Sequence, residues 1–336
     1  MKVIELSTPA LVVDSVALAR NLDTMSAALP GDRLRPHVKA HKCTALAREQ
    51  AARGHTGFTC ATPREVVGLA AAALGADLLL ANECVDRERV RAMAESGARV
   101  TVAVDGDATI AVAAESGVRE VLVDVNVGLR CGCRPDDAGR VADRARAAGL
   151  DVRGVMAYEA HAQLLDDRDA RAATVDKAMA RMQVAYELVG GSVRSGGGTG
   201  TYDINPALTE IQAGSYALMD TAYERLALPF DPALRLVATV VHVDRDYAVA
   251  DCGLKALGMD HGLPIVEHAG DVVYCSDEHI AFVPGRMPGV GDRVLVRPAH
   301  VDPTVAYHER MHLADGPGIE ATILDTLPVD LRGWDT

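Results

Sequence analysis

Arg33–Thr44 reads RLRPHVKAHKCT and puts Lys39 at the end of a short β-type run, directly before a polar turn that opens a helix. In an α/β fold, a buried strand ending in HVK delivers the lysine amine to the mouth of the fold. Partial desolvation there lowers the proton affinity of the amine and makes it a nucleophile, which makes Lys39 a candidate Schiff-base lysine. A surface lysine beside two histidines explains this stretch about as well, so the rest of the chain has to decide.

Up to about residue 220, short apolar and β-branched runs alternate with stretches of helical period rich in Ala, Arg and Leu. This alternation is typical of βα units that share a parallel sheet. Thr62 and Glu65 form a capping box before the predicted helix Pro63–Leu74. Eight units predict a (β/α)8 TIM-like barrel, with a doubly wound sheet as the alternative. The predicted strands are Leu34–Lys39, Gly57–Thr62, Leu78–Ala81, Arg99–Val104, Val121–Asn126, Gly154–Tyr158, Ser192–Ser195 and Glu210–Ala213.

The pattern changes after about Leu226. Segments such as LRLVATVVHV, YAVADCG and HIAFVP are strand-like, have Gly and Pro turns between them and lack strong helical periodicity. We therefore predict two domains, a barrel over residues 1–226 and a mostly β domain over residues 227–336. The strand-like segment Ala10–Asp14 precedes the barrel, so residues 1–14 could join the β domain instead.

Composition limits the classes of partner. The chain has 336 residues, a net charge of -13 and no basic cluster, which argues against nucleic acid and membrane surfaces and favours a small-molecule substrate. The longest apolar run, Val66–Ala76, is shorter than the roughly 20 residues of a membrane span. The N-terminus lacks a signal-peptide pattern, so we expect a cytoplasmic protein. The seven cysteines lack CxxC spacing and predict neither a disulfide framework nor a zinc ribbon.

The glycine-rich loop SGGGTGT, Ser195–Thr201, follows the seventh predicted strand, where barrels often bind phosphate. Its small residues let backbone N–H groups approach an anion, and the hydroxyls of Ser195, Thr199 and Thr201 add donors. The tripeptide GSY after the eighth strand either completes this cradle or forms a plain turn. The predicted phosphate-binding residues are Ser195, Gly197, Gly198, Thr199, Gly214, Ser215 and Tyr216.

Two further loops carry candidate functional groups. VDVNVGLRCG ends the fifth predicted strand, and its Arg130 can hold an anionic or phenolic oxygen through the planar guanidinium. A helix-capping arginine on the surface is the alternative. MAYEAH ends the sixth strand and brings Tyr158, Glu159 and His161 as general acid/base groups. One of them could be only a supporting hydrogen-bond partner, and a lone histidine is more often structural.

A candidate metal site lies in VRPAHVDPTVAYH, residues 296–308. If the backbone is extended from His300 to Asp302, both side chains project from one face, as two ligands of one ion require. The carboxylate shifts the preference towards harder ions such as Mn, Mg or Ca. The alternative is that the site binds no metal: His300 is an ordinary histidine, and Asp302 forms a turn before Pro303. The spacing alone slightly favours this alternative.

Taken in order, RPHVKAHK, ATPREV, VDVNVGLRCG, YEAH, SGGGTGT, IQAGSYALMD, DCGLKAL and PAHVDPTV cover almost the whole chain. This ordered set resembles the D-threonine aldolase and D-serine dehydratase group of the alanine-racemase-like (fold type III) pyridoxal-phosphate enzymes. The resemblance implies a barrel with a β-rich C-terminal domain. It also implies a head-to-tail homodimer.

The resemblance assigns roles to the candidate residues. Lys39, rather than Lys42, would carry pyridoxal 5'-phosphate, and Arg130 would contact the ring oxygen of the cofactor. SGGGTGT and GSY would bind the phosphate. Tyr158 would contact the cofactor and, with His161, supply acid/base groups. His300 and Asp302 would hold a divalent metal, with Mn as first choice and Mg, Ca, Co or Zn as alternatives.

The reaction implied by the resemblance is a lyase reaction on a D-β-hydroxy-α-amino acid. A retro-aldol cleavage of D-threonine type gives glycine and an aldehyde, with His161 or metal-bound water as the base. A D-serine or D-3-hydroxyaspartate-type dehydratase, which gives a keto acid and ammonia, is the alternative. The dehydratase members typically have Cys at the position of Asp302, so this chain is closer to the aldolases. A non-catalytic pyridoxal-phosphate carrier is a further alternative, although single-barrel carriers lack a β domain.

Overall fold

The computed structural model describes residues 1–128 and 130–335. Leu129, inside the motif VDVNVGLRCG, and Thr336, at the end of the predicted β domain, lie outside the described residues. The chain divides into two compact units. The barrel unit comprises Met25–Lys39, Leu46–Gly214 and the residues from Leu331 onward, and the β unit comprises Met1–Thr24, Ala40–Ala45 and Ser215–Asp330. The predicted domain boundary at residue 226 stays a prediction.

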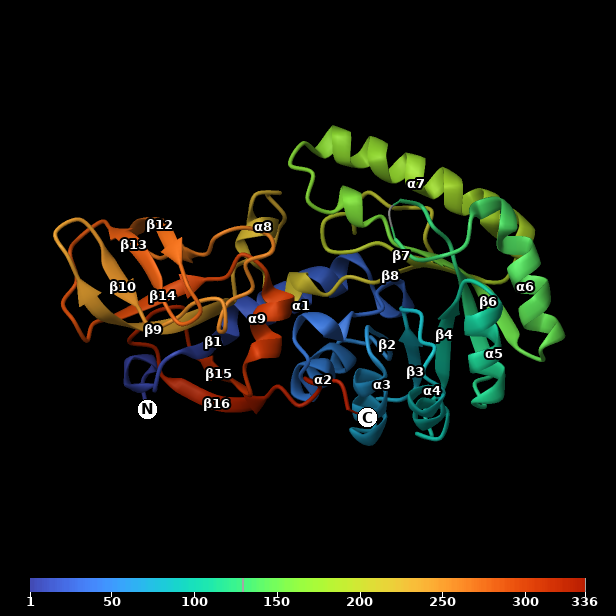
Figure 1. Cartoon of the computed structure of the whole chain (residues 1–336), viewed down its shortest axis with the longest axis horizontal. Helices are drawn as coiled ribbons and strands as arrows, with labels where there is room; N and C mark the ends of the chain where they lie inside the picture. Colours follow the sequence, from blue (N-terminus) through green and yellow to red (C-terminus); the bar gives the residue numbers. More distant parts are fainter. Residues whose placement is uncertain (129, 336) are drawn as a thin grey trace. The chain divides into compact units, whose positions relative to one another are not determined.

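A parallel sheet forms the centre of the barrel unit. In the described residues it has seven strands in the order β2-β3-β4-β5-β6-β7-β8 (Figure 1). The strands are short and buried, as expected for a parallel sheet that is covered on both faces, and β4 is buried at every position. They are β2 (Gly57–Cys60), β3 (Asp77–Leu80), β4 (Val100–Val104), β5 (Glu120–Asp124), β6 (Asp151–Ala157), β7 (Val193–Gly196) and β8 (Glu210–Ile211).

Helices connect these strands, and Figure 1 shows α3 to α6 along one side of the sheet. The Thr62 hydroxyl accepts the Glu65 N–H at 3.3 Å, which is the expected N-cap, whereas the Glu65 carboxylate accepts from Ala61 rather than from Thr62. The connecting helices are α3 (Pro63–Ala71), α4 (Arg87–Ala94), α5 (Asp107–Glu115), α6 (Ala138–Ala147) and α7 (Arg168–Val189). Before β2, α1 (Ser15–Ala28) belongs mostly to the β unit and α2 (Thr44–Ala52) mostly to the barrel unit. Short 3₁₀ turns are η2 (Gly31–Arg33), η3 (Val38–Ala40), η4 (Pro135–Asp137) and η5 (Ala160–Ala162).

The first predicted strand, Leu34–Lys39, is not a continuous strand. Leu34 forms an isolated parallel bridge to Ile211 of β8, and His37 forms one to Thr59 of β2. Pro36 lacks an N–H group, so it can form a backbone hydrogen bond to β2 only through its carbonyl, which accepts from the Thr59 N–H. The described residues therefore form a curled parallel sheet of seven strands, and the first predicted strand is reduced to isolated bridges that end before Lys39.

The β unit is built on a second, mainly antiparallel sheet. In the part of the chain that the structure describes, this sheet has nine strands: the path β12-β13-β10-β9-β1-β15-β16, with β14 paired to β9 and β11. β1 joins it by pairing with β9 and, in parallel, with β15. The strands are β1 (Ala10–Asp14), β9 (Leu234–Val243), β10 (Ala248–Ala250), β11 (Ile265–Val266), β12 (Ala269–Cys275), β13 (Ile280–Pro284), β14 (Arg293–Arg297), β15 (Arg310–Ala314) and β16 (Ile323–Pro328). Its helices are η1 (Val3–Glu5), η6 (Ser215–Ala217), α8 (Thr221–Glu224) and α9 (Val301–Tyr307).

Each unit has its own hydrophobic core. In the barrel unit Leu79, Ala103, Leu122 and Met156 pack together from neighbouring strands. In the β unit a cluster joins the N-terminal segment to the sheet, with Val3, Leu6, Ala10, Val12, Val237 and Ala314 as its members. No helix among residues 1–128 and 130–335 combines the length and the hydrophobicity that crossing a lipid bilayer requires.

An ion-pair layer lies on the barrel strands two residues before this apolar cluster. Asp77 precedes Leu79 and Glu120 precedes Leu122 by two positions, so the charged and apolar side chains share one face of their strands. Arg35 bonds Asp77 at 3.0 Å and Glu210 at 2.8 Å, and Arg153 bonds Asp77 at 2.9 Å. Burial alone would favour the neutral acid, but Arg153 and Arg35 lower the pKa of Asp77 to about 2.

We predict that Asp77→Asn lowers the free energy of unfolding by about 2 kcal/mol at pH 7. The pKa of Asp77 rises from about 2 to its ordinary value of 3.8 on unfolding, so the stabilisation is complete well above pH 4 and disappears as the pH falls through 2. Urea unfolding followed by circular dichroism at pH 7 and pH 3 should show the difference between wild type and variant falling to about half at pH 3. Asp136→Asn, at an exposed pair with Arg134, is the control with little effect at either pH. A difference that does not change with pH would contradict the assignment.

Candidate active site

Lys39 lies in η3, at the edge of the barrel where the parallel strands end. The His37 N–H donates to the Ala213 carbonyl at 3.0 Å, so the chain leaves the sheet at His37 beside the end of β8. Lys39 follows two residues later and Gly214 follows Ala213 directly, which makes them parts of adjacent loops. Lys39 is half-buried, and its neighbours Val38 and Ala40 are fully buried. The predicted position at a strand end is thus corrected to a helical turn just beyond it, at the same edge.

The glycine-rich loop begins next to the loop that carries Tyr158. Ala157 pairs with Gly196 in the sheet, so Tyr158 and Gly197 are the first residues beyond two neighbouring strands. A Cβ atom on Gly196 would lie 2.1 Å from the Ala157 carbonyl oxygen, and Gly197 has φ +72°, a left-handed conformation. Both glycines are therefore required by the backbone of the chain itself.

A buried carboxylate holds the shape of this loop. Glu159 accepts hydrogen bonds from the Thr201 hydroxyl at 2.6 Å, from Gln163 at 3.1 Å and from Asn205 at 3.3 Å. The Thr201 hydroxyl in turn accepts the Gly198 N–H at 3.2 Å. Burial raises the pKa of Glu159, and the Thr201 hydrogen bond opposes this rise. Glu159 and the Thr201 hydroxyl, which the sequence offered as an acid/base group and an anion donor, are thus used within the scaffold.

The other predicted phosphate-binding residues are divided between the two units. The buried Ser195 hydroxyl accepts from Gln212 at 2.8 Å, and Thr199 is buried. Gly214 ends its segment of the barrel unit. Ser215 and Tyr216 open η6 in the β unit, where both are buried.

Arg130 follows β5 and ties two strand ends together. It donates to Asp124 at 2.8 Å and to the Ala81 carbonyl, beyond the end of β3, at 3.3 Å. Burial raises the pKa of Asp124 well above its usual range, and the Glu83 carboxylate adds to this while Arg130 opposes it. Arg130 is half-buried, so its guanidinium is held in a fixed position at the strand edge.

His161 lies in η5, and its ring packs against Gly128. A Cβ atom on Gly128 would come within 2.5 Å of His161 Cε1. The histidine is exposed, unlike Glu159 two residues earlier. One part of the imidazole thus lies against Gly128, and the residue is otherwise open to solvent. An exposed imidazole can exchange protons with water, which suits an acid/base group.

His300 and Asp302 lie together in the β unit. The His300 Nε2 atom is 3.9 Å from Asp302 Oδ2, and both side chains are largely buried. The expectation that the backbone is extended through Asp302 is wrong, because α9 begins at Val301 and only His300 is extended. Pro303 and an acidic residue both suit the first turn of a helix, which explains the early start. The side chains meet nevertheless, since His300 is the N-cap of that helix.

The sequence interpretation missed a second group of ligand-type residues. This group lies near the Nδ1 atom of His300, whereas Asp302 lies near Nε2. Asp260, His261 and His300 each offer a ligand atom within 4.8 Å of the others. His300 Nδ1 lies 2.8 and 2.9 Å from the two oxygens of Asp260. The only signal in the sequence was the dipeptide Asp260–His261 in a turn, 40 residues before His300, and no spacing rule connects them.

Asp220 fixes the backbone at Val301, between the candidate metal ligands His300 and Asp302. Its carboxylate accepts from the N–H groups of Val301 at 2.9 Å and Tyr223 at 3.1 Å. Burial raises the pKa of Asp220 to about 6, the two N–H groups and His300 oppose this, and Asp302 adds to it. The start of α9 is thereby anchored to the start of α8 within the β unit.

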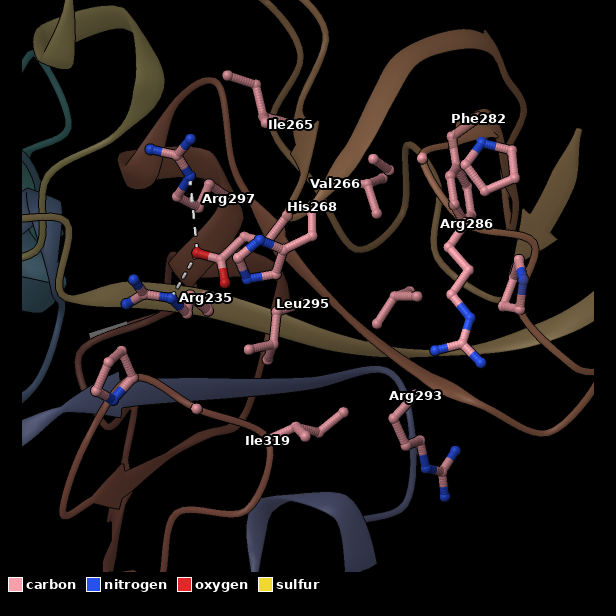
Figure 2. Close-up of a pocket in the computed structure, with 18 residues that line it drawn as sticks. Arg235, Ile265, Val266, His268, Phe282, Arg286, Arg293, Leu295, Arg297 and Ile319 are labelled. Atoms are coloured by element: carbon pink, nitrogen blue, oxygen red, sulfur yellow. Dashed lines mark hydrogen bonds and ion pairs between the residues drawn. The ribbon is translucent and has the colours of Figure 1, made fainter.

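The β unit also contains a cavity of about 840 Å³ that none of the predicted site residues lines. Figure 2 shows Arg235 and Arg297 directed at one carboxylate between them, that of Glu267, at 2.8 and 3.8 Å. Arg297 also pairs with Glu224. The arginines at this end of the cavity are therefore largely neutralised by the protein's own carboxylates.

Models of two known domains match most of the chain. That of the alanine racemase N-terminal domain matches residues 13–222, and that of the putative serine dehydratase domain matches residues 233–314. The 3-hydroxy-D-aspartate aldolase of Paracoccus denitrificans (strain Pd 1222) is 33% identical, in a match that covers 91% of this chain and 88% of that protein. The D-threonine aldolase of Arthrobacter sp is 32% identical, in a match that covers 97% of this chain and 93% of that protein.

A solved structure is similar over both units. The D-threonine aldolase from Filomicrobium marinum matches with a TM-score of 0.90 and 33% identity, over 98% of this chain and 96% of that one. These similarities confirm the predicted fold class and the predicted class of enzyme, a pyridoxal-phosphate-dependent carbon-carbon lyase. The chain belongs to the alanine-racemase-like family, in the group that contains the D-threonine and 3-hydroxy-D-aspartate aldolases.

Proposed function

We propose that this protein is a pyridoxal-phosphate- and divalent-metal-dependent aldolase that cleaves D-β-hydroxy-α-amino acids of D-threonine type to glycine and an aldehyde. The observation that carries the metal part of this proposal is the His300–Asp302 pair. Two atoms that each lie about 2.1 Å from one ion are roughly 3 to 4 Å apart, and His300 Nε2 and Asp302 Oδ2 are separated by 3.9 Å. The carboxylate favours Mn²⁺ or a similar hard ion over a thiolate-type zinc site.

The barrel-unit residues fit pyridoxal phosphate. Lys39 supplies an amine, and Arg130 supplies a fixed guanidinium for the phenolic oxygen of the cofactor. The loop from Ser195 to Thr199 approaches an anion with backbone N–H groups, and the adjacent loop begins at Gly214. In this proposal Ser215 and Tyr216 continue the second loop, and Tyr158 contacts the cofactor from the end of β6.

The proposed reaction gives the cofactor residues and the metal pair separate tasks. When bound, pyridoxal phosphate supplies an electron sink for the α-carbon, and a divalent ion supplies a Lewis acid for the β-hydroxyl. Lys39 would hold the cofactor, and Arg130 would keep its ring oriented. His161 would accept the proton of the β-hydroxyl. The Cα–Cβ bond would then break with its electron pair left at Cα, so that the aldehyde leaves and a proton delivered to Cα completes glycine.

A dehydratase is the second candidate, because the model that matches residues 233–314 is named for a putative serine dehydratase domain. It would use the same residues but remove the α-proton first and then expel the hydroxyl group. In either case we propose a cytoplasmic homodimer.

The test of function is a product assay on purified protein with pyridoxal phosphate and Mn²⁺, with D-threonine and D-serine supplied separately. We expect glycine and acetaldehyde from D-threonine, and we expect a chelator to abolish the reaction. A keto acid and ammonia would establish the dehydratase instead. A protein that binds pyridoxal phosphate but turns over neither substrate would favour the carrier.

Asp302→Ala should lower the aldolase rate about 100-fold or more, because it removes one of two protein ligands, and excess Mn²⁺ should restore it only in part. Asp271→Ala removes an exposed carboxylate from β12 of the same unit and should leave the rate unchanged. An Asp302→Ala variant with the wild-type dependence on Mn²⁺ would place the metal elsewhere.

Lys39→Arg should abolish the visible absorbance of lysine-bound pyridoxal phosphate, because a guanidinium keeps the charge but cannot form the covalent bond. Lys42→Arg is the matched control and should keep that absorbance. Borohydride reduction followed by peptide mass spectrometry would locate the modified lysine directly. Modification of Lys42 in the wild-type protein would reverse the assignment.

Gly197→Ala should weaken pyridoxal phosphate binding by about 10-fold, because a side chain at φ +72° costs roughly 1 to 2 kcal/mol and shifts the loop. Gly54→Ala imposes a similar backbone penalty at φ +96° in a turn with open space around it. Both variants should lose stability, but only Gly197→Ala should lose affinity in a fluorescence titration. Equal affinities would remove this loop from the proposed phosphate site.

A further inference from the structure

The two ring nitrogens of His300 face different carboxylates. Nδ1 lies 2.8 and 2.9 Å from the oxygens of Asp260, and Nε2 lies 3.9 Å from Asp302 Oδ2. A neutral imidazole has one N–H group and one lone pair, so a hydrogen bond at one nitrogen decides which nitrogen can bind a metal. A carboxylate can only accept at Nδ1, which leaves the lone pair on Nε2, on the side of Asp302.

We propose that Asp260 is a positioning residue that holds His300 as the Nδ1–H tautomer and directs its Nε2 lone pair at the metal. The inference rests on the proposed function, because it concerns the metal site of the aldolase. A carboxylate that accepts from the distal nitrogen of a ligand histidine raises the basicity of that histidine and fixes its ring. Asp260 is then a partner of the ligand rather than a ligand.

The stacking of His261 on His300 argues against a metal bound at the Nδ1 edge. The two rings are nearly parallel, at 12°, with centroids 3.8 Å apart. An imidazole lone pair lies in the plane of its ring. An ion shared by both rings would have to lie between the two planes, well outside each of them, where neither lone pair points. Asp260, His261 and His300 are thus close enough for three ligands, but the two imidazoles are wrongly oriented.

Backbone contacts place Asp260 beside His300. Gly258 forms an antiparallel bridge with His300, and its N–H donates to the Thr304 hydroxyl at 2.9 Å. That hydroxyl donates to the His300 carbonyl at 2.6 Å. A Cβ atom on Gly258 would lie 2.3 Å from Pro303 Cγ, so the close approach of the two segments needs a glycine. The position of Asp260, two residues after Gly258, is therefore set by the fold and not by the hydrogen bond to His300 alone.

The direct test is the affinity of the purified holoprotein for Mn²⁺, measured from the electron paramagnetic resonance signal of the free ion. Asp302→Ala should weaken binding more than any other variant, by about 100-fold or more. Asp260→Ala should weaken binding by about 10- to 100-fold, and Asp260→Asn should weaken it less because its amide oxygen can still accept from Nδ1. His261→Phe keeps a stacked ring and should bind Mn²⁺ as the wild type does. Asp271→Ala controls for the loss of one negative charge from the β unit.

Two results would overturn the inference. Wild-type Mn²⁺ affinity in Asp260→Ala would show that Asp260 does not support His300. Loss of binding in His261→Phe, together with retained binding in Asp302→Ala, would place the ion at the Nδ1 edge. The proposed function has a separate outcome: a wild-type protein that binds Mn²⁺ through His300 but does not cleave D-threonine would reject the aldolase and keep the role of Asp260. A wild type that binds no Mn²⁺ would reject both.

Discussion

The parallel sheet of the barrel unit closes through three hydrogen bonds of one short segment. The N–H groups of Arg35 and His37 donate to Ile211 and Ala213 at one edge, and the Pro36 carbonyl accepts from Thr59 at the other. Strand pairing requires extended backbone, and the chain turns as soon as this segment is past. Lys39 is therefore delivered to the edge where β8 ends, next to the loop that begins at Gly214. The position of the candidate lysine depends on this closure more than on any contact of its own side chain.

Arg35 links this closure to the opposite end of the barrel. Its backbone joins the sheet edge, while its side chain, 6% exposed, bonds Asp77 and Glu210 on two strands that are far apart in the chain. Buried charges are tolerated only when they are paired and hydrogen-bonded. The N-terminal end of the barrel satisfies its charges internally, so it offers little to a ligand. The polar groups at the C-terminal strand ends are the ones that can receive a ligand, as in barrels generally.

Local patterns predicted the barrel, and also the positions of Lys39 and of the glycine-rich loop, because period and turn chemistry are encoded in neighbouring residues. They did not predict the 3₁₀ turn at Lys39, which follows Pro36, or the helix that begins at Val301, which has Pro303 in its first turn. In each case one proline changes the local geometry. They also could not find Asp260, because its relation to His300 depends on a bridge between segments 40 residues apart. Glu159 was named as an acid/base candidate, but its structural role could not be identified for the same reason: its partners Thr201 and Asn205 come from the loop after the next strand.

The hydrogen bonds around Glu159 fix the shape of the glycine-rich loop, which we propose as the phosphate site, although glycine is the most flexible residue. Ordering a loop of glycines on binding would cost conformational entropy for each residue. Here the Thr201 hydroxyl connects Gly198 to Glu159, and Gln163 Oε1 accepts the Gly200 N–H at 3.0 Å. The backbone is thus held by buried side chains of the protein itself. A binding loop whose shape is fixed beforehand loses less conformational entropy on binding. A larger part of the interaction energy of its backbone N–H groups then contributes to the binding free energy.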